Sequence, residues 1–303
     1  MSGYPGITAG YLIRGERPCL VETGTARSAP TVQAALAELG LGPGDLAAVV
    51  VTHIHLDHAG GVGDVAELFP KAEVYVHPAG ARHLVDPERL VASARRVFGS
   101  VLDDLFGPLR PTAADRVRVL DDGGQVDLGG GRRLEVFHAP GHAQHHVGLV
   151  DALSGDLYVG DAAGVYVPET ADVRPATPPP DFDLDLALDS LRRFRAAAPR
   201  RLLFSHFGPV TDVTGTLDRS EEELRRWVEL VGAAREAQLD LDHAVAMVRE
   251  RTADRYRGLL TRPEVVEKFE HLSSTAANIV GLNRWLNQAT GHEYQFGDAA
   301  GDR

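Results

Sequence analysis

Three histidines and one aspartate occupy residues 53–58 in the pattern H-x-H-x-D-H. Imidazole and carboxylate groups are the ligands that proteins use for zinc, iron and manganese. The apolar, β-branched run before them, residues 47–51, is typical of a buried strand, and α/β proteins place their sites at such strand ends. In an extended segment His53 and His55 project to one side and can share a metal ion, whereas the last two residues of the motif must turn elsewhere. We therefore interpret the motif as half of a two-metal site rather than as a solvated polar turn.

Three later strand-like runs each end in a further ligand type. These ligand types are His142 after residues 133–137 and a Pro-Gly turn, Asp161 after residues 156–160, and His206 after residues 201–205. A carboxylate can bridge two ions and a histidine cannot, which singles out Asp161 as the bridge.

The order H-x-H-x-D-H, P-G-H, G-D and S-H resembles the metallo-β-lactamase-fold hydrolases in their dinuclear, glyoxalase II-like form. The resemblance covers residues 7–213 and implies an α/β fold, the αββα four-layer sandwich. It implies a first metal held by His53, His55 and His142, a second held by Asp57, His58 and His206, and Asp161 between them. The chain also resembles a group of prokaryotic proteins with P-G-H-A-x-H-H-V, G-D-A-A-G-V-Y and T-P-P-P motifs. This second resemblance does not indicate a substrate.

Two departures narrow what the resemblance implies. The family's first hairpin commonly ends in Asp-Thr-Gly, whereas this chain reads Val21-Glu22-Thr23-Gly24, and we expect this structural change to adjoin the site. The flavodiiron branch has Glu at the position of His55, and true β-lactamases lack the full second ligand set. Both activities are therefore disfavoured.

Length and composition favour a cytoplasmic enzyme. The 303 residues accommodate a catalytic domain over residues 1–215 and a C-terminal helical region over residues 216–303. The net charge of −12 disfavours nucleic-acid partners, and neither a leader pattern nor a membrane-length apolar run occurs. A single cysteine, Cys19, excludes an intramolecular disulfide framework.

Helical patterns are predicted at residues 30–39, 61–69 and 78–109, the last as a lid over the site or as a packed outer helix pair. The Pro-rich segment 165–181 is expected to be irregular and extended, forming one wall of the substrate cleft. Apolar residues recur at helical spacing over 220–292. In glyoxalase II such a region helps bind the glutathione part of the substrate; here it is analogous in position only, and packing or a homodimer is an equal expectation.

Tyr166 follows Asp161 by five residues and could hydrogen-bond a substrate carbonyl or its oxyanion, although packing at the rim is the alternative. His145 and His146 are expected to support the ligands or the core rather than to bind metal.

Together these features predict a hydrolase with two divalent metal ions, zinc being favoured over iron or manganese. Such ions lower the pKa of a shared water, which would attack an ester, thioester or lactone of a small-molecule substrate while Asp57 or a metal-bound water manages the proton. No G-x-S-x-G elbow or second cysteine offers another nucleophile. Two alternatives stay open: an iron enzyme using dioxygen, similar to the persulfide dioxygenases, and a metal-bound regulatory protein with little turnover.

Overall fold

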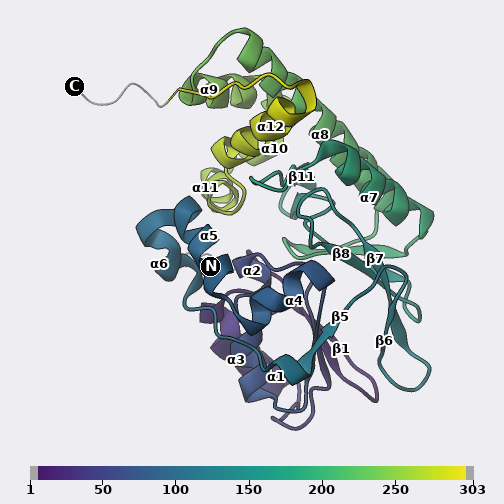
Figure 1. Ribbon diagram of the computed structural model, residues 1–303. Coiled ribbons are helices and arrows are strands. Elements are labelled where there is room, and N and C mark those ends of the chain that lie inside the picture. Colours follow the sequence, from purple (N-terminus) through teal and green to yellow (C-terminus); the bar gives the residue numbers. More distant parts are fainter. Residues whose placement is uncertain (1–5, 298–303) are drawn as a thin grey trace.

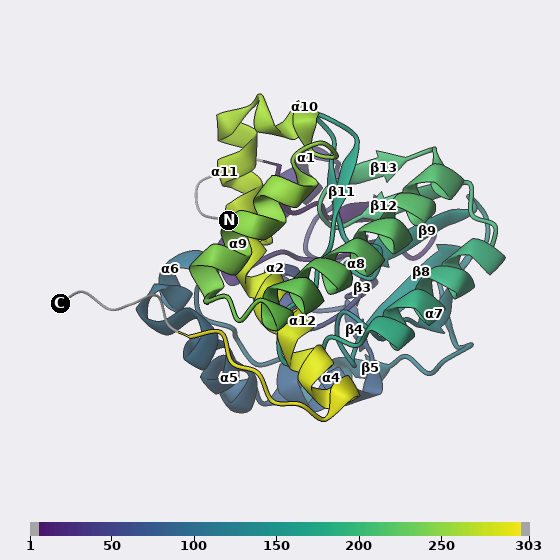
Figure 2. The ribbon, with the colours of Figure 1, turned by 90° about the horizontal axis from the view of Figure 1, so that it is seen from above.

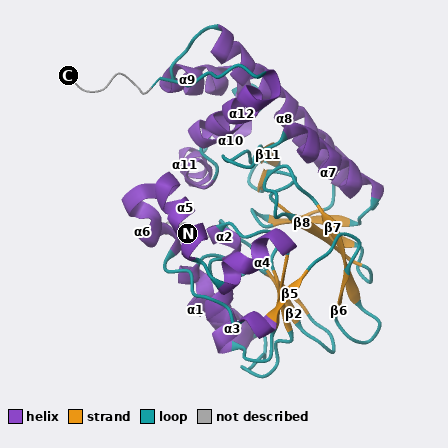
Figure 3. Cartoon of the chain, in the orientation of Figure 1, coloured by secondary structure: helices purple, strands orange, loops and turns teal. Residues whose placement is uncertain are grey.

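Two facing β-sheets with helices on their outer faces form the body of the protein (Figure 1, Figure 3). This computed structural model describes residues 6–297. The arrangement confirms the αββα sandwich predicted from the sequence, with further helices toward the C-terminus.

The first sheet has the strand order β1-β2-β3-β4-β5, with β1 and β2 antiparallel and the later neighbours parallel. Its strands are β1 (Tyr11–Ile13), β2 (Cys19–Val21), β3 (Ala48–Val50), β4 (Glu73–Val76) and β5 (Val117–Val119). Its helices are α1 (Ala29–Glu38), α2 (Leu56–Ala59), α3 (Val62–Leu68), α4 (Pro78–Val85), α5 (Glu88–Phe98) and α6 (Leu102–Phe106), with short 3-10 turns η1 (Ala26–Ser28), η2 (Gly99–Val101) and η3 (Ala114–Arg116).

The second sheet has the order β13-β12-β9-β8-β7-β6, in which only β12 and β9 are parallel neighbours. Its strands are β6 (Gln125–Asp127), β7 (Arg133–His138), β8 (Val147–Asp151), β9 (Asp156–Gly160), β12 (Arg201–Phe204) and β13 (Gly208–Val210). The helices α7 (Leu184–Ala196) and α8 (Val213–Glu236) cover its outer face (Figure 1).

Of the remaining helices, the first and last in chain order pack against α8 and against each other, and the two between them pack against one another; Figure 2 shows them from above. They are α9 (Leu241–Thr252), α10 (Arg257–Leu260), α11 (Pro263–Leu272) and α12 (Thr275–Thr290). None of the helices in residues 6–297 combines the length and apolar character that a membrane span needs.

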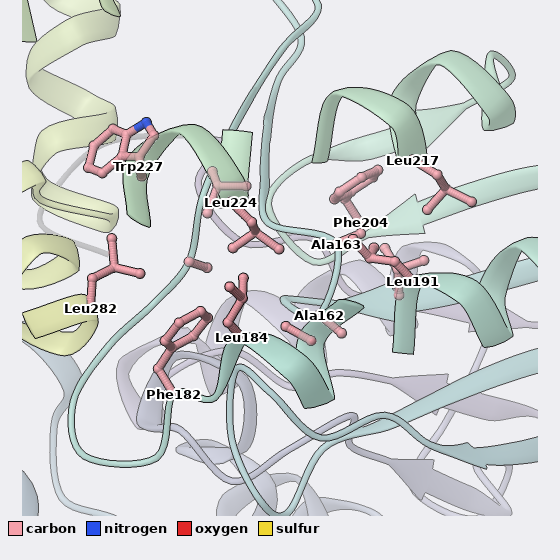
Figure 4. Close-up of a cluster of buried hydrophobic side chains, with 14 of the residues drawn as sticks. Ala162, Ala163, Phe182, Leu184, Leu191, Phe204, Leu217, Leu224, Trp227 and Leu282 are labelled. Atoms are coloured by element: carbon pink, nitrogen blue, oxygen red, sulfur yellow. The ribbon is translucent and has the colours of Figure 1, made fainter. Parts of the chain in front are cut away.

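Three buried clusters hold these layers together. One lies between the sheets and joins Val21 and Val50 of the first sheet to Leu149 of the second. A second packs the first sheet against α1 and α3. The third continues from the second sheet through α7 and α8 into the C-terminal helices, and its labelled members in Figure 4 are Ala162, Ala163, Phe182, Leu184, Leu191, Phe204, Leu217, Leu224, Trp227 and Leu282. Because burial of apolar surface drives folding, this shared core makes the helical tail part of the same folded unit.

Several local expectations can now be compared with the structure. The helices predicted at 30–39 and 61–69 are found as α1 and α3. The expected boundary between residues 215 and 216 falls inside α8, so no linker separates the two regions. Within 78–109, α6 packs on α2 through Leu102, Phe106 and Leu56, as a packed outer helix would.

The expectation of a wholly irregular segment at 165–181 is wrong. Its first half is a hairpin of β10 (Val165–Val167) and β11 (Asp172–Arg174), paired antiparallel. The pattern was missed because both strands are only three residues long, too short for apolar alternation to stand out. Pro168 lies in the turn of this hairpin, and the other prolines of the segment come after β11, where they keep residues 175–180 out of helix and strand.

Candidate metal centre

All seven candidate ligands follow strands and meet at one place. His53 and His55 lie in the loop after β3, Asp57 and His58 belong to α2, and His142, Asp161 and His206 follow β7, β9 and β12. Their ligand atoms form three groups within which every atom lies within 4.8 Å of the others: His53–His55–His142, His53–His58–Asp161 and Asp57–His58–His206. The fold therefore brings together every residue that the sequence predicts as a ligand.

The first group is a triangle of ring nitrogens. His55 Nδ1 lies 3.0 Å from His53 Nε2 and 3.0 Å from His142 Nε2. His55 ends the extended segment as the N-cap of α2, with φ −60° and ψ 150°, which keeps its ring beside that of His53.

The second group, Asp57–His58–His206, adds a carboxylate to two imidazoles, and the remaining group, His53–His58–Asp161, connects it to the first. His206 Nε2 lies 3.2 Å from His58 Nε2 and 3.3 Å from Asp57 Oδ2. Because α2 begins at Leu56, the chain turns after His55 and directs Asp57 and His58 to this second group, as the spacing of the motif predicts.

Asp161 lies between the two groups. Its Oδ1 is 3.6 Å from Nε2 of both His58 and His206, and its Oδ2 is 3.7 Å from His142 Nε2. Oδ1 is buried and has no hydrogen-bond partner within the described part of the chain. A buried anionic oxygen without a donor is costly unless a cation lies beside it, so the position suits a carboxylate shared by two metals.

The outward-facing ring nitrogens show which nitrogens can bind a cation. His142 Nδ1 donates to the Ala176 carbonyl at 2.9 Å and His206 Nδ1 to the Ile7 carbonyl at 2.7 Å. A carbonyl only accepts, so in each ring the proton is on Nδ1 and the inward Nε2 carries a lone pair. His58 Nδ1 likewise faces Glu22 Oε2 at 3.1 Å. Inward lone pairs that converge on one another need a cation between them, and the residues present therefore fit two metal ions.

The electrostatics agree with a site for positive charge. Burial alone would lower the pKa of His58, but the carboxylates of Asp161 and Asp57 outweigh burial and raise it well above its usual value. Burial alone would raise the pKa of Asp161, but His58 and His206 outweigh it and hold that pKa well below its usual range. The centre thus keeps its carboxylates ionised and attracts a proton or a divalent cation to the same place.

Glu22 adjoins the site, as expected from its place in the first hairpin, and it supports His58, a role that the sequence does not reveal. Its side chain is fully buried, its backbone has a φ of 67°, and Oε1 accepts the Thr52 N–H at 2.8 Å while Oε2 faces His58 Nδ1. A non-glycine residue at positive φ is uncommon, which indicates that the surrounding contacts hold it there. A lone carboxylate directly after an apolar strand was the available signal.

His145 and His146 lie beside the centre but in none of the three groups of described residues. His146 Nε2 accepts the Asp161 N–H at 3.1 Å, and the His145 ring stacks on that of His53, with 6.1 Å between centroids. Both contacts support ligand residues, in the way the sequence analysis expects.

Tyr166 lies in β10, half-buried, with its ring 5.6 Å from that of Phe204. Burial raises the pKa of its hydroxyl, and the charges that act on it are those of Arg219, Asp212 and Asp172. These neighbours belong to β11, α8 and the residue that caps α8. The proposed contact of Tyr166 with substrate stays a prediction.

Comparison with known proteins places this centre in a family. The chain matches the family model of the Metallo-beta-lactamase superfamily over residues 3–206, and it belongs to that superfamily. Members are largely hydrolases.

Three relatives are similar over about half of the chain. They are the metallo-beta-lactamase fold-containing protein ST1585 of Sulfurisphaera tokodaii (32% identical, covering 54% of this chain and 61% of that protein), the hydroxyacylglutathione hydrolase of Aeromonas hydrophila (34%, covering 50% and 44%) and the acyl-coenzyme A thioesterase MBLAC2 of Gallus gallus (32%, covering 50% and 56%). The chain thus spans less than two thirds of each of these relatives.

Solved structures agree with the fold. The ST1585 structure matches with a TM-score of 0.61 at 29% identity, covering 74% of this chain and 82% of that chain. A di-iron-bound form of TTHA1623 matches with a TM-score of 0.54 at 26% identity, covering 72% and 95%.

Proposed function

We propose that this protein is a dinuclear metal-dependent hydrolase of a small-molecule ester, thioester or lactone. The observation that carries the proposal is Asp161, which faces His142 with one oxygen and His58 and His206 with the other. A hydrolase or sensor with one metal would need only one set of ligands, either the set around His142 or the set around His58 and His206.

Zinc is the metal we propose, with iron or manganese as alternatives for the same nitrogen and oxygen donors. His53, His55 and His142 would hold one ion, Asp57, His58 and His206 the other, and Asp161 both. When bound, such ions polarise a carbonyl oxygen and lower the pKa of water to near neutral. A pair of ions therefore removes the need for a protein nucleophile.

The exposure of the ligand side chains indicates from which side a substrate can approach. His53, His58 and His206 are fully buried, whereas Asp57 retains 17% of its side-chain exposure and His55 is also partly exposed. Substrate therefore reaches the centre over Asp57 and His55. Asp57 is the one partly exposed carboxylate in the centre, and we assign it the task of taking up and returning the proton during hydrolysis.

Two relatives support a thioester as the bond that is cleaved. One is named a hydroxyacylglutathione hydrolase and the other an acyl-coenzyme A thioesterase. The oxygen-using alternative draws on a different observation, the di-iron form of a structural neighbour, and the metal content of the protein decides between them.

The test is metal analysis of protein purified without added metal, combined with a panel of thioesters, lactones and aryl esters on the same sample. We expect about two zinc ions per chain and turnover of at least one thioester that a chelator abolishes and zinc restores. Two iron ions with no hydrolysis would favour oxygen chemistry, and a metal content near zero would overturn the proposal.

A further inference from the structure

The segment between β11 and α7 contacts the metal centre through one backbone atom. His142 Nδ1 donates to the carbonyl of Ala176 at 2.9 Å. This hydrogen bond fixes both the tautomer and the ring orientation of His142, so the position of the Ala176 carbonyl determines where His142 Nε2 points.

The C-terminal helices hold the residues on both sides of Ala176. Before it, Arg174 donates to Glu270 Oε1 of α11 at 2.7 Å, and Ser273 Oγ donates to the Pro175 carbonyl at 3.1 Å. After it, the Thr177 N–H donates to Asn278 Oδ1 of α12 at 2.7 Å. The Thr177 hydroxyl also lies 2.9 Å from the same oxygen.

The approach of α12 to this segment is as close as backbone allows. A Cβ added at Gly281 would stand 1.8 Å from the Thr177 carbonyl oxygen, so only glycine permits the contact. Asn278 is 3% exposed and Thr177 is fully buried. Water does not replace these hydrogen bonds at such burial, and the loss of one partner leaves the other unsatisfied.

Packing alone does not account for this arrangement. Apolar side chains could cover the segment, but they would leave buried backbone groups such as the Thr177 N–H without a hydrogen-bond partner. The polar contacts fix the backbone of residues 174–177 in one position: the Thr177 N–H belongs to the same peptide as the Ala176 carbonyl, and the Pro175 carbonyl belongs to the peptide before it.

We propose that Asn278 is a positioning residue for the metal centre, through which α12 sets the Ala176 carbonyl and thereby the orientation of His142. The inference rests on the proposed dinuclear centre. It gives the C-terminal helices a task in metal binding that is separate from contact with substrate.

The test compares metal affinity in Asn278→Ala and in a matched control. Val248→Ala removes a fully buried side chain from α9, a helix that contacts α8 and α12, and controls for a loss of packing in the helical region. Zinc and cobalt are titrated against a chromogenic chelator to resolve two binding steps, and the thermal unfolding of each variant is recorded.

We expect Asn278→Ala to weaken one binding step by on the order of tenfold, the lower end of the range for outer contacts of metal ligands, and to leave the other step unchanged. The cobalt spectrum of the weakened step should also change, because the orientation of one imidazole is altered. Val248→Ala should lower stability without moving either step.

Ser273→Ala is a milder second variant. It removes the donor to the Pro175 carbonyl and one of the two acceptors of Asn278 Nδ2, which still donates to the Ser274 carbonyl, and the Asn278 side chain itself is kept. It should weaken the same step by a smaller factor, and it serves as the test if Asn278→Ala does not fold. Unchanged affinity in the folded variants, or equal losses in Val248→Ala, would overturn the inference while the dinuclear centre stands. A wild-type protein that binds no cation would overturn the centre itself, and this inference with it.

Discussion

The two halves of the sandwich contribute to the metal centre in opposite ways. The first sheet supplies His53, His55, Asp57 and His58 from one strand end, and their support comes from neighbours such as Glu22, directly after the adjacent strand β2. The second sheet supplies one ligand from each of three strands. Two of those ligands, His142 and His206, are oriented by backbone carbonyls 34 and 199 residues away.

This difference indicates which ligands are most sensitive to substitutions elsewhere in the chain. The first half depends on few elements, β3, α2 and the neighbouring β2, because its ligands are local in sequence. The second half exists only when β7, β9 and β12, the segment around Ala176 and the C-terminal helices are all in place. Substitutions far from the centre should therefore affect the ligands of the second sheet more than those of the first.

The largest effect is expected from Asp161→Ala, because Asp161 contacts both groups. The variant should lose metal from both positions and reduce turnover on the order of a thousandfold, since bound ions supply several kcal/mol of transition-state stabilisation. Metal analysis and kcat/KM on the best substrate check this. Asp189→Ala, at an exposed ion pair on α7, is the control. Full metal content with retained turnover would rule out a shared carboxylate.

A smaller effect, confined to the local half, is expected from Glu22→Gln. The amide can still accept the Thr52 N–H, but its NH₂ would face the Nδ1–H of His58, donor against donor. We expect affinity for one metal to fall by about 10- to 100-fold. Isothermal titration against the exposed control Glu38→Gln measures the change. An equal loss of affinity for both metals would show that the two groups of ligands do not bind independently.

The stability of the C-terminal helices that hold the segment around Ala176 should depend on pH through Glu270. Burial opposes its ionisation, but Arg174 and the hydrogen bonds from Thr275 outweigh burial and lower the pKa of Glu270 to about 2; Arg249 also contacts this carboxylate, at 3.2 Å. An unfolded glutamate has a pKa of about 4.3. Because the folded pKa is the lower one, the carboxylate stabilises the fold above about pH 4.3, and that contribution is lost as the pH falls toward 2.

Glu270→Gln should therefore be less stable than wild type at pH 7, by about 1 kcal/mol, and the difference should shrink below pH 4. Urea unfolding of metal-free protein between pH 7 and pH 3 tests this, with Glu264→Gln, exposed on the same helix, as the reference. A difference that does not vary with pH would mean that the ion pair contributes nothing.

The smallest effect is expected from Tyr166→Phe. The ring would keep its contact with Phe204, and the hydroxyl that is removed interacts with charges in β11 and near α8. We expect kcat and KM to change less than about threefold. A loss of kcat by a factor on the order of a hundred would instead reveal a donor to the oxyanion.

The local half of the site is also the half that one sequence reveals. Residues 53–58 show their chemistry directly, and His142, Asp161 and His206 could be added because each follows a strand-like run. The partners that orient these ligands could not be found in this way. Every residue type has a backbone carbonyl, so nothing in the sequence marks Ile7 and Ala176 as acceptors. The contact of Glu22 with His58 depends on strand pairing, which the sequence does not show. The continuity of α8 across residues 215 and 216 was hidden for a similar reason, since helix packing and not composition determines it.

The Ala176 carbonyl has a consequence for how this protein can vary. A backbone oxygen is present whatever side chain the residue carries, so a mutational scan or an alignment of relatives would show little constraint at position 176 from this contact. The constraint would be recorded at Asn278, Thr177 and Gly281, which hold that peptide in place. Selection on metal binding would thus conserve Asn278, about a hundred residues along the chain from the carbonyl that it positions.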